Sequence, residues 1–143
     1  ELLGWGCNFK SGTDSEVIAQ LLAYAPGKDW GDSIGYMMNR LQGAYSLVAL
    51  TKDAVMAIRD PLGVRPLCLG KLHKGWVVAS ESCALDHVGA EYIREIEPGE
   101  AIMIDASGVH TIHKHTDEKR ALCVFELIYF TYRVSGSEEV LTA

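Results

Sequence analysis

The sequence contains no long apolar run and no pattern of a secretory leader. Its apolar runs are short, as in Val55-Met56-Ala57-Ile58, whereas a membrane-spanning helix needs about 20 apolar residues in succession. No charged segment followed by an apolar stretch opens the chain, as a secretory signal would require. We therefore expect no membrane partner. The first residue is Glu1 and not methionine, which indicates processing or truncation.

Basic side chains are also scarce. The chain has 13 lysines and arginines against 19 aspartates and glutamates, which gives a formal net charge of −6. A nucleic-acid-binding surface needs a basic patch, so we expect no nucleic-acid partner. Apolar residues at 48% and charged residues at 22% are ordinary values for a globular protein, and 143 residues correspond to about one domain.

Paired cysteines and the common catalytic motifs are absent. The four cysteines, Cys7, Cys68, Cys83 and Cys123, form no C-x-x-C pair, which argues against a zinc ribbon or a thioredoxin-like site. Cys68 and Cys83 lie in apolar segments, so we expect both to be small buried residues in a reducing compartment, the cytoplasm. There is no glycine-rich phosphate loop, no G-x-S-x-G elbow and no H-E-x-x-H.

Three histidines lie close together near residue 113. On a strand, His113 and His115 would share one face and could hold a metal ion, with His110 nearby. The alternative is a polar strand end that runs into the charged segment 116–120. The lack of an acidic or cysteine partner at ligand spacing favours the strand end.

Two amphipathic helices are predicted before residue 43. Thr13 or Asp14 can cap the first helix, and Pro26-Gly27 ends it. Its apolar stripe consists of Val17, Ile18, Leu21 and Leu22. The second helix is expected from about Gly31 to Arg40. Its buried side consists of Ile34, Met37 and Met38, with Leu41 just beyond.

From residue 43 onward the pattern predicts strands joined by hairpins. The expected strands are residues 44–50, 55–58, 67–72, 75–80, 92–97, 101–105, 109–113 and 121–130, with a short helix at 82–87. Connections such as Thr51-Lys52-Asp53-Ala54 are short and polar, so neighbouring strands should pair antiparallel. Helices grouped before antiparallel strands indicate an α+β domain rather than a doubly wound sheet.

Asp14 and the run Arg59–Leu67 are the features that could carry chemistry. Asp14 can cap its helix, or it can grip the ammonium group of an amino-acid substrate. In Arg59–Leu67, two prolines and Gly63 fix a stiff bend. Arg59, Asp60 and Arg65 are close enough in sequence to form an ion-pair network that pins this bend.

A third feature is Ala79–Leu85, where a strand runs into a helix. Ser80 or Ser82 can cap that helix, with Glu81 near the positive end of the helix dipole. Considered as isolated residues, these side chains have structural roles.

Taken in order, these features resemble the class II glutamine amidotransferases. Six motifs carry the resemblance: Thr13–Ile18, Leu41–Ser46, Arg59–Leu67, Ala79–Leu85, Ile96–Glu100 and Cys123–Phe130. Each is modestly specific, but their combination is similar to the amidophosphoribosyltransferase family over nearly all of residues 9–130.

The resemblance implies an N-terminal-nucleophile hydrolase sandwich, in which helical layers surround two antiparallel sheets, and this chain would be a partial domain of that fold. In this family an amino-terminal cysteine attacks the glutamine amide, with its own α-amino group as base. The ammonia then reacts with phosphoribosyl pyrophosphate in the first committed step of purine synthesis. Glu1 is not cysteine and Cys7 is internal, so we expect the nucleophile and the oxyanion-hole Asn-Gly pair upstream of Glu1. No catalytic residue is expected within the chain, which should be inactive alone.

By the same resemblance, Asp14 is expected to bind the substrate glutamine. Arg59, Asp60 and Arg65 are expected to serve structure, or coupling to a phosphoribosyltransferase domain downstream of Ala143. The full-length enzyme is expected to be a homo-oligomer.

No cofactor is expected in this chain. Magnesium is expected in the full-length enzyme, and Cys123 matches one ligand of the 4Fe–4S cluster that some relatives hold. Residues 1–130 are interpreted as the partial glutaminase domain that lacks its N-terminal part. Residues 131–143 form a divergent tail, because the family continues with Ala-Arg-Pro-Asp-Ser after Tyr129-Phe130.

Two other hypotheses stay open. The chain could belong to another class II amidotransferase, such as asparagine synthetase or glutamate synthase. It could also be a non-catalytic remnant that acts as a binding or interaction module. The Arg-Pro-Leu end of the bend and the Cys-x-Phe-Glu segment favour the purine enzyme.

Overall fold

A computed structural model describes residues 2–115 of the chain, in which short helices precede and interrupt a series of strands. The elements are η1 (Leu2–Trp5), α1 (Asp14–Tyr24), α2 (Trp30–Met38), β1 (Ser46–Leu50), β2 (Val55–Arg59), β3 (Cys68–Leu72), β4 (Gly75–Ala79), α3 (Ser82–His87), β5 (Glu91–Glu95), β6 (Glu100–Asp105) and β7 (Gly108–Lys114).

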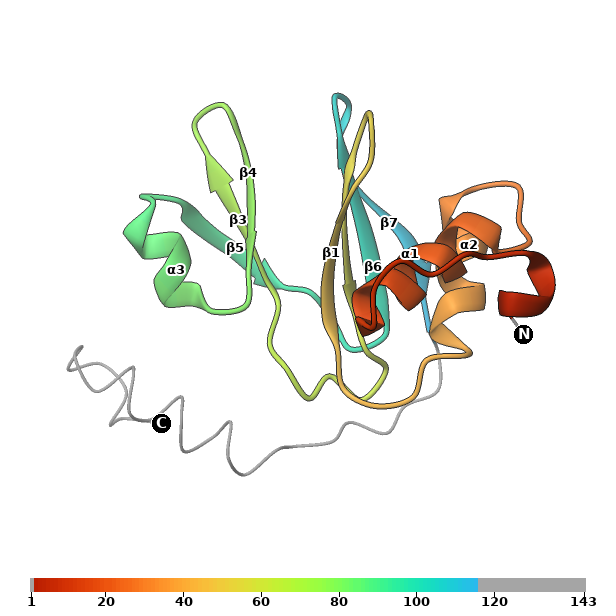
Figure 1. The fold of residues 1–143 in the computed structure, drawn as a ribbon. Coiled ribbons are helices and arrows are strands. Elements are labelled where there is room, and N and C mark those ends of the chain that lie inside the picture. Colours follow the sequence, from red (N-terminus) through yellow and green to blue (C-terminus); the bar gives the residue numbers. More distant parts are fainter. Residues whose placement is uncertain (1, 116–143) are drawn as a thin grey trace.

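The strands form two antiparallel sheets. One has four strands in the order β1-β2-β6-β7, and the other has three strands in the order β4-β3-β5. The sheets face each other, with α1 and α2 outside the four-stranded sheet and α3 outside the three-stranded sheet (Figure 1). This arrangement confirms the predicted α+β class and the sandwich of two antiparallel sheets between helical layers.

Three apolar cores lie between these layers. Between the two sheets lie Ala57, Leu67, Leu69, Ile96 and Ile102. Between α1, α2 and the four-stranded sheet lie Leu21, Ile34, Met37, Met38, Met56, Ile58 and Ala101. The third core, between α3 and the three-stranded sheet, contains Cys68, Leu85 and Ala90. β2 faces two cores, because Met56 and Ile58 point to the helices while Ala57 points to the other sheet.

Both predicted helices form, with small shifts of their ends. The N-cap of α1 is Thr13, but its side chain makes no capping hydrogen bond. Asp29 caps α2 by accepting a 2.9 Å hydrogen bond from the Asp32 amide. Within the predicted apolar stripe of α1, Leu21 is buried but Val17 is 40% exposed.

The seven strands predicted between residues 44 and 113 and the helix at 82–87 also form, with ends that move by one or two residues. Cys83, expected to be buried, is exposed. The helix α3 buries Leu85, and a residue two positions away on a helix points to a different side. Neither Ser80 nor Ser82 caps α3; the cap position is Glu81, whose carboxylate instead accepts a hydrogen bond from the Cys83 thiol.

The predicted strand 121–130, the tail 131–143 and Cys123 lie outside the described residues, so these predictions stay open. No helix within residues 2–115 is long and apolar enough to cross a membrane.

Candidate functional site

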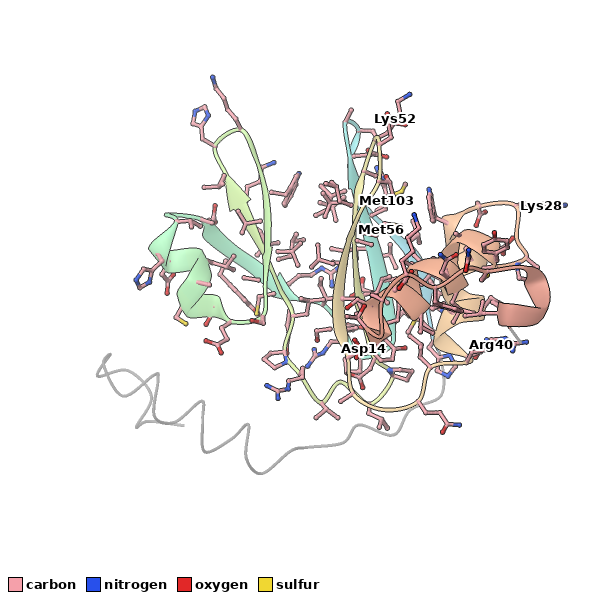
Figure 2. The ribbon with its side chains drawn as sticks, in the orientation of Figure 1. Asp14, Lys28, Arg40, Lys52, Met56 and Met103 are labelled. Atoms are coloured by element: carbon pink, nitrogen blue, oxygen red, sulfur yellow. The ribbon has the colours of Figure 1, made fainter. Side chains whose placement is uncertain are left out.

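Asp14 is the first residue of α1, and its side chain is exposed. Figure 2 shows it at the end of the sandwich where β1 begins, opposite the β1–β2 turn that carries Lys52. Its Oδ1 accepts a 2.8 Å hydrogen bond from the Ser15 amide, which orients the carboxylate across the start of the helix. An exposed carboxylate in this position can receive an ammonium group by a charge-assisted hydrogen bond.

The segment before Asp14 is fixed by Glu16. The Glu16 carboxylate accepts hydrogen bonds from the Lys10 amide at 2.8 Å, the Ser11 amide at 2.7 Å and the Ser11 hydroxyl at 2.5 Å. These bonds, the Ser11 hydroxyl first, lower the pKa of Glu16 below its ordinary value. Sequence analysis missed this role, although the spacing Thr13-x-x-Glu16 is the signal of a capping box. In a capping box Glu16 would bind the Thr13 amide, whereas here it binds the amides of Lys10 and Ser11, which lie further upstream.

Arg59 lies at the end of β2 and is only 6% exposed. Its guanidinium donates to three backbone carbonyls: Nε to Arg65 at 2.9 Å, one terminal nitrogen to Ile96 at 2.6 Å, and the other to Gly63 at 2.9 Å. It also pairs with Glu95 at 2.9 Å. Arg59 therefore joins the connection between β2 and β3 to the connection between β5 and β6, the two places where the chain passes between sheets.

Asp60 is completely buried and organises the same bend. Its Oδ1 accepts hydrogen bonds from the Leu62 amide at 2.9 Å and the Gly63 amide at 2.8 Å. Gly63 has φ +63°, and a Cβ there would meet the Pro98 ring at 2.5 Å. The bend is stiff as predicted, but Arg59 and Asp60 bind backbone groups rather than each other. The predicted ion pair between Arg59 and Asp60 is therefore wrong, while the part of Arg65 in the network stays a prediction.

A buried polar pair lies beneath this bend. The Asp60 amide donates to the Tyr45 carbonyl at 3.0 Å. Within the described residues, the Tyr45 hydroxyl and the Asp60 Oδ2 atom have no hydrogen-bond partner. Burial first, and the negative charge of Asp60 second, raise the pKa of Tyr45 to about 12. The phenol therefore stays neutral at physiological pH.

Glu100 on β6 binds Arg94 on β5 and so forms a second link between the two sheets. It is 4% exposed and accepts a bidentate pair from Arg94 at 2.7 and 2.8 Å, together with the Glu97 amide at 2.8 Å and the Thr111 hydroxyl at 2.9 Å. Burial raises the pKa of Glu100, but these hydrogen bonds outweigh it and the pKa lies below 4.5. Sequence analysis identified the motif Ile96–Glu100 but not its partner Arg94, which belongs to β5.

A Ser-His-Asp set occurs at the β6–β7 turn without the geometry of a catalytic triad. Ser107 Oγ lies 2.8 Å from His110 Nε2, and the Asp105 carboxylate lies 3.5 Å from the same nitrogen. In a triad the carboxylate orients the histidine through the other ring nitrogen. Asp105 also accepts from the Ser107 amide at 2.7 Å, so the set closes a turn.

The described residues offer no ligand set for a metal. They contain no group of three or more histidine, cysteine or acidic side chains that could hold a metal ion, and Cys7 and Cys68 are buried. Burial raises the pKa of the Cys68 thiol. The ring of His113 packs against Gly35 of α2, and burial, with His115 second, lowers the pKa of His113. The predictions about magnesium and about an iron–sulfur cluster at Cys123, which lies outside the described residues, stay open.

The structure thus places the predicted site residues in two groups. Asp14 is exposed at the start of α1, while Arg59 and Asp60 are buried beneath the bend that ends at Leu67. Figure 2 shows Asp14 at the end of the sandwich where β1 begins, and Arg59 lies at the same end because it pairs with Ser46, the first residue of β1.

Comparison with known proteins shows the family of the chain. Residues 1–87 match the family model described as glutamine amidotransferase domain. The amidophosphoribosyltransferase of Rattus norvegicus is 39% identical over 154 residues, covering 91% of this chain and 30% of that protein. The amidophosphoribosyltransferase of Synechocystis sp. is 44% identical over 134 residues, covering 88% of this chain and 27% of that protein.

Solved structures give the same result. A glutamine phosphoribosylpyrophosphate amidotransferase from B. subtilis, complexed with ADP and GMP, has a TM-score of 0.83 and 37% identity, covering 91% of this chain and 29% of that one. A structure titled as the allosteric regulatory enzyme of purine biosynthesis has the same TM-score and identity. The chain therefore spans about 30% or less of the length of these relatives.

Proposed function

Because this chain belongs to the glutamine amidotransferase domain family, we propose that it is the glutamine-binding part of an amidophosphoribosyltransferase. In such an enzyme, glutamine is hydrolysed and its ammonia replaces the pyrophosphate of phosphoribosyl pyrophosphate. The observation that carries the proposal is the identity of 39–44% to curated amidophosphoribosyltransferases over about nine-tenths of the chain. The nucleophilic cysteine, the oxyanion hole and the phosphoribosyltransferase domain would belong to the rest of the enzyme.

The cofactors and the cellular setting are part of this proposal. Magnesium would be bound with the pyrophosphate group outside residues 2–115, and Cys123 could ligate a 4Fe–4S cluster only with partners from elsewhere. The reduced cysteines Cys7, Cys68 and Cys83 support a cytoplasmic location.

Within this chain, Asp14 would bind the α-ammonium group of glutamine. The carboxylate is exposed, it stands at the end of the sandwich where β1 begins, and Glu16 fixes the residues that precede it. Such a contact selects amino acids over other amides, because an analogue that lacks the ammonium group forms no ion pair with Asp14.

A binding experiment tests this role. Glutamine and 4-carbamoylbutanoate, which lacks only the α-amino group, are titrated into the 15N-labelled chain, and the amide shifts of residues 10–16 are followed. We expect glutamine to shift these signals and to bind more tightly than the analogue. Asp14→Asn should remove this preference, because a neutral amide binds an ammonium group less strongly than a carboxylate does.

The control is Asp53→Asn in the β1–β2 turn, an exposed aspartate next to Lys52 at the opposite end of the sheet. It makes the same change in charge and should keep the preference for glutamine. Equal affinities of the original chain for the two ligands would contradict the proposed role of Asp14.

We also propose that the 143-residue chain alone releases no ammonia from glutamine. Cys7 is 5% exposed and its nitrogen lies in a peptide bond, so it has neither the access nor the adjacent amino group that the family mechanism requires. Ammonia release is measured with a coupled glutamate dehydrogenase assay. A thioester on Cys7, detected by mass spectrometry with a glutamine analogue, would refute this statement.

A further inference from the structure

Glu16, on the first turn of α1, ties the segment before the helix to the helix itself. One of its carboxylate oxygens accepts a hydrogen bond from the Lys10 amide at 2.8 Å. The other oxygen accepts from the Ser11 amide at 2.7 Å and from the Ser11 hydroxyl. Residues 10–13 therefore form a closed loop that leads directly into Asp14, the residue proposed to hold the ammonium group of glutamine.

This loop determines how the chain enters α1. Asp14 is the first helical residue, and Thr13 before it is extended, with φ −91° and ψ 143°. The Ser11 hydroxyl lies 2.9 Å from the Thr13 hydroxyl, so Ser11 contacts both Glu16 and the residue next to Asp14. The backbone at residues 13 and 14 sets the direction in which the Asp14 side chain leaves the helix. A carboxylate that fixes the loop therefore also fixes that direction.

The charge of Glu16 suits it to this task. Hydrogen bonds from N–H and O–H groups to an ionised carboxylate are stronger than those to a neutral acceptor, and a negative charge in the first turn also interacts favourably with the helix dipole. The same bonds, that of the Ser11 hydroxyl first, lower the pKa of Glu16, so the side chain is ionised at physiological pH. Among residues 2–115, the Thr13 side chain makes no capping hydrogen bond, and Glu16 anchors this turn in its place.

We propose that Glu16 is a positioning residue for glutamine, which holds Asp14 in the direction that receives the ammonium group. This inference rests on the proposed role of Asp14, and Glu16 acts through Asp14 rather than by contact with the substrate. A hydrogen bond weakens steeply when its angle and distance depart from the ideal, and a group that is already held in its bound direction loses less entropy on binding. Loss of the Glu16 bonds should therefore weaken recognition of the ammonium group although Asp14 itself is unchanged.

The ratio of the affinities for glutamine and for 4-carbamoylbutanoate measures this effect in the 143-residue chain. We expect Glu16→Ala to lower the preference for glutamine by about threefold to tenfold, because the ion pair with Asp14 loses its fixed geometry. A variant that is merely less stable binds both ligands less well and keeps their ratio. The control is Glu91→Ala, which removes the same charge from an exposed position on β5 in the other sheet and should keep the preference.

Ser11→Ala separates the position of Asp14 from the charge of Glu16. This substitution removes one donor to the Glu16 carboxylate and leaves every charge of the chain in place. If Glu16 acts by holding the loop, the preference for glutamine should fall by about twofold to threefold. If the charge of Glu16 merely attracted the ammonium group, the preference would not change, and that result would overturn the proposal. Ser11→Ala also provides the test in case Glu16→Ala does not fold.

A double substitution tests whether Glu16 acts through Asp14. Asp14→Asn is expected to remove the preference for glutamine, so the addition of Glu16→Ala should lower it no further. Independent, additive effects of the two substitutions would overturn the proposal. Hydrogen exchange checks the loop itself, since the amides of Lys10 and Ser11 should exchange faster in Glu16→Ala than in the original chain.

The outcomes distinguish this inference from the proposed function on which it rests. A folded Glu16→Ala that keeps the preference for glutamine, while Asp14→Asn loses it, would overturn the positioning role of Glu16 and leave the role of Asp14 standing. If Asp14→Asn also keeps the preference, or if the original chain has none, both are wrong.

Discussion

Replacement of Arg59 by alanine should destabilise the fold more than the loss of an exposed ion pair would. The three carbonyls that Arg59 binds belong to Gly63, Arg65 and Ile96. Each hydrogen bond to a charged group contributes about 1.5–3 kcal/mol. In the variant, water can hydrate the carbonyls of Gly63 and Arg65, because that loop is partly exposed. The carbonyl of the fully buried Ile96 has no such access.

We therefore expect Arg59→Ala to lower the free energy of unfolding by about 3–5 kcal/mol. The ion pair with Glu95 contributes little to this value, because Glu95 is 50% exposed and water screens the interaction. Arg59→Lys keeps the positive charge but lacks the planar fork that reaches three acceptors. It should therefore lose about half of the same free energy, or roughly 2 kcal/mol.

The measurement is urea unfolding followed by circular dichroism, with linear extrapolation to water. Lys114→Ala is the control, since Lys114 pairs with Glu97 at 2.6 Å but both side chains are more than half exposed. Its effect should be within about 1 kcal/mol. If Arg59→Ala is as mild as Lys114→Ala, or if Arg59→Lys is as stable as the original chain, the reasoning about backbone carbonyls is wrong.

Two further predictions concern the same region. Gly63→Ala should lower the free energy of unfolding by about 2–4 kcal/mol, because alanine is strained at positive φ and its Cβ meets Pro98. The control is Gly75→Ala, which has open space around its Cβ and should change the free energy of unfolding by about 0.5 kcal/mol or less. Equal effects of the two substitutions would refute the account of the bend. Because the pKa of Glu100 is lowered in the folded state, its contribution to stability is present above pH 4.5 and is lost as the pH falls below that value. Glu100→Gln should therefore give a shallower decline of unfolding free energy with acid, and parallel curves for the two proteins would contradict this.

The sequence predicted the type and order of the elements well, because the signals involved are local, whereas the sandwich of two sheets between helical layers was implied by the family resemblance. Short polar turns such as Thr51–Ala54 specify antiparallel neighbours, and the apolar stripe of α2 marks the side that is buried. The burial of Ile34, Met37 and Met38 was predicted from their spacing alone.

The partners of the charged residues could not be predicted in the same way. Arg59 binds the carbonyl of Ile96, which lies 37 residues away, and Glu100 binds Arg94 across a turn. Spacing along the chain places Arg59 next to Asp60 and suggests an ion pair. Only the tertiary structure shows that Arg59 and Asp60 instead bind backbone groups. The exposure of Cys83 was missed because an apolar segment does not indicate which side of a short helix faces outward.

The place where Arg59 joins the two inter-sheet connections has a consequence for folding. The chain leaves the four-stranded sheet after β2 and returns to it at β6, and the Arg59 guanidinium holds the ends of this excursion together. The three-stranded sheet is thus an insertion into the four-stranded sheet, and Arg59 binds both the β2–β3 connection that leads into it and the β5–β6 connection that leads out of it. Because Arg59 ties the two inter-sheet connections together, the two sheets should unfold in a single cooperative transition.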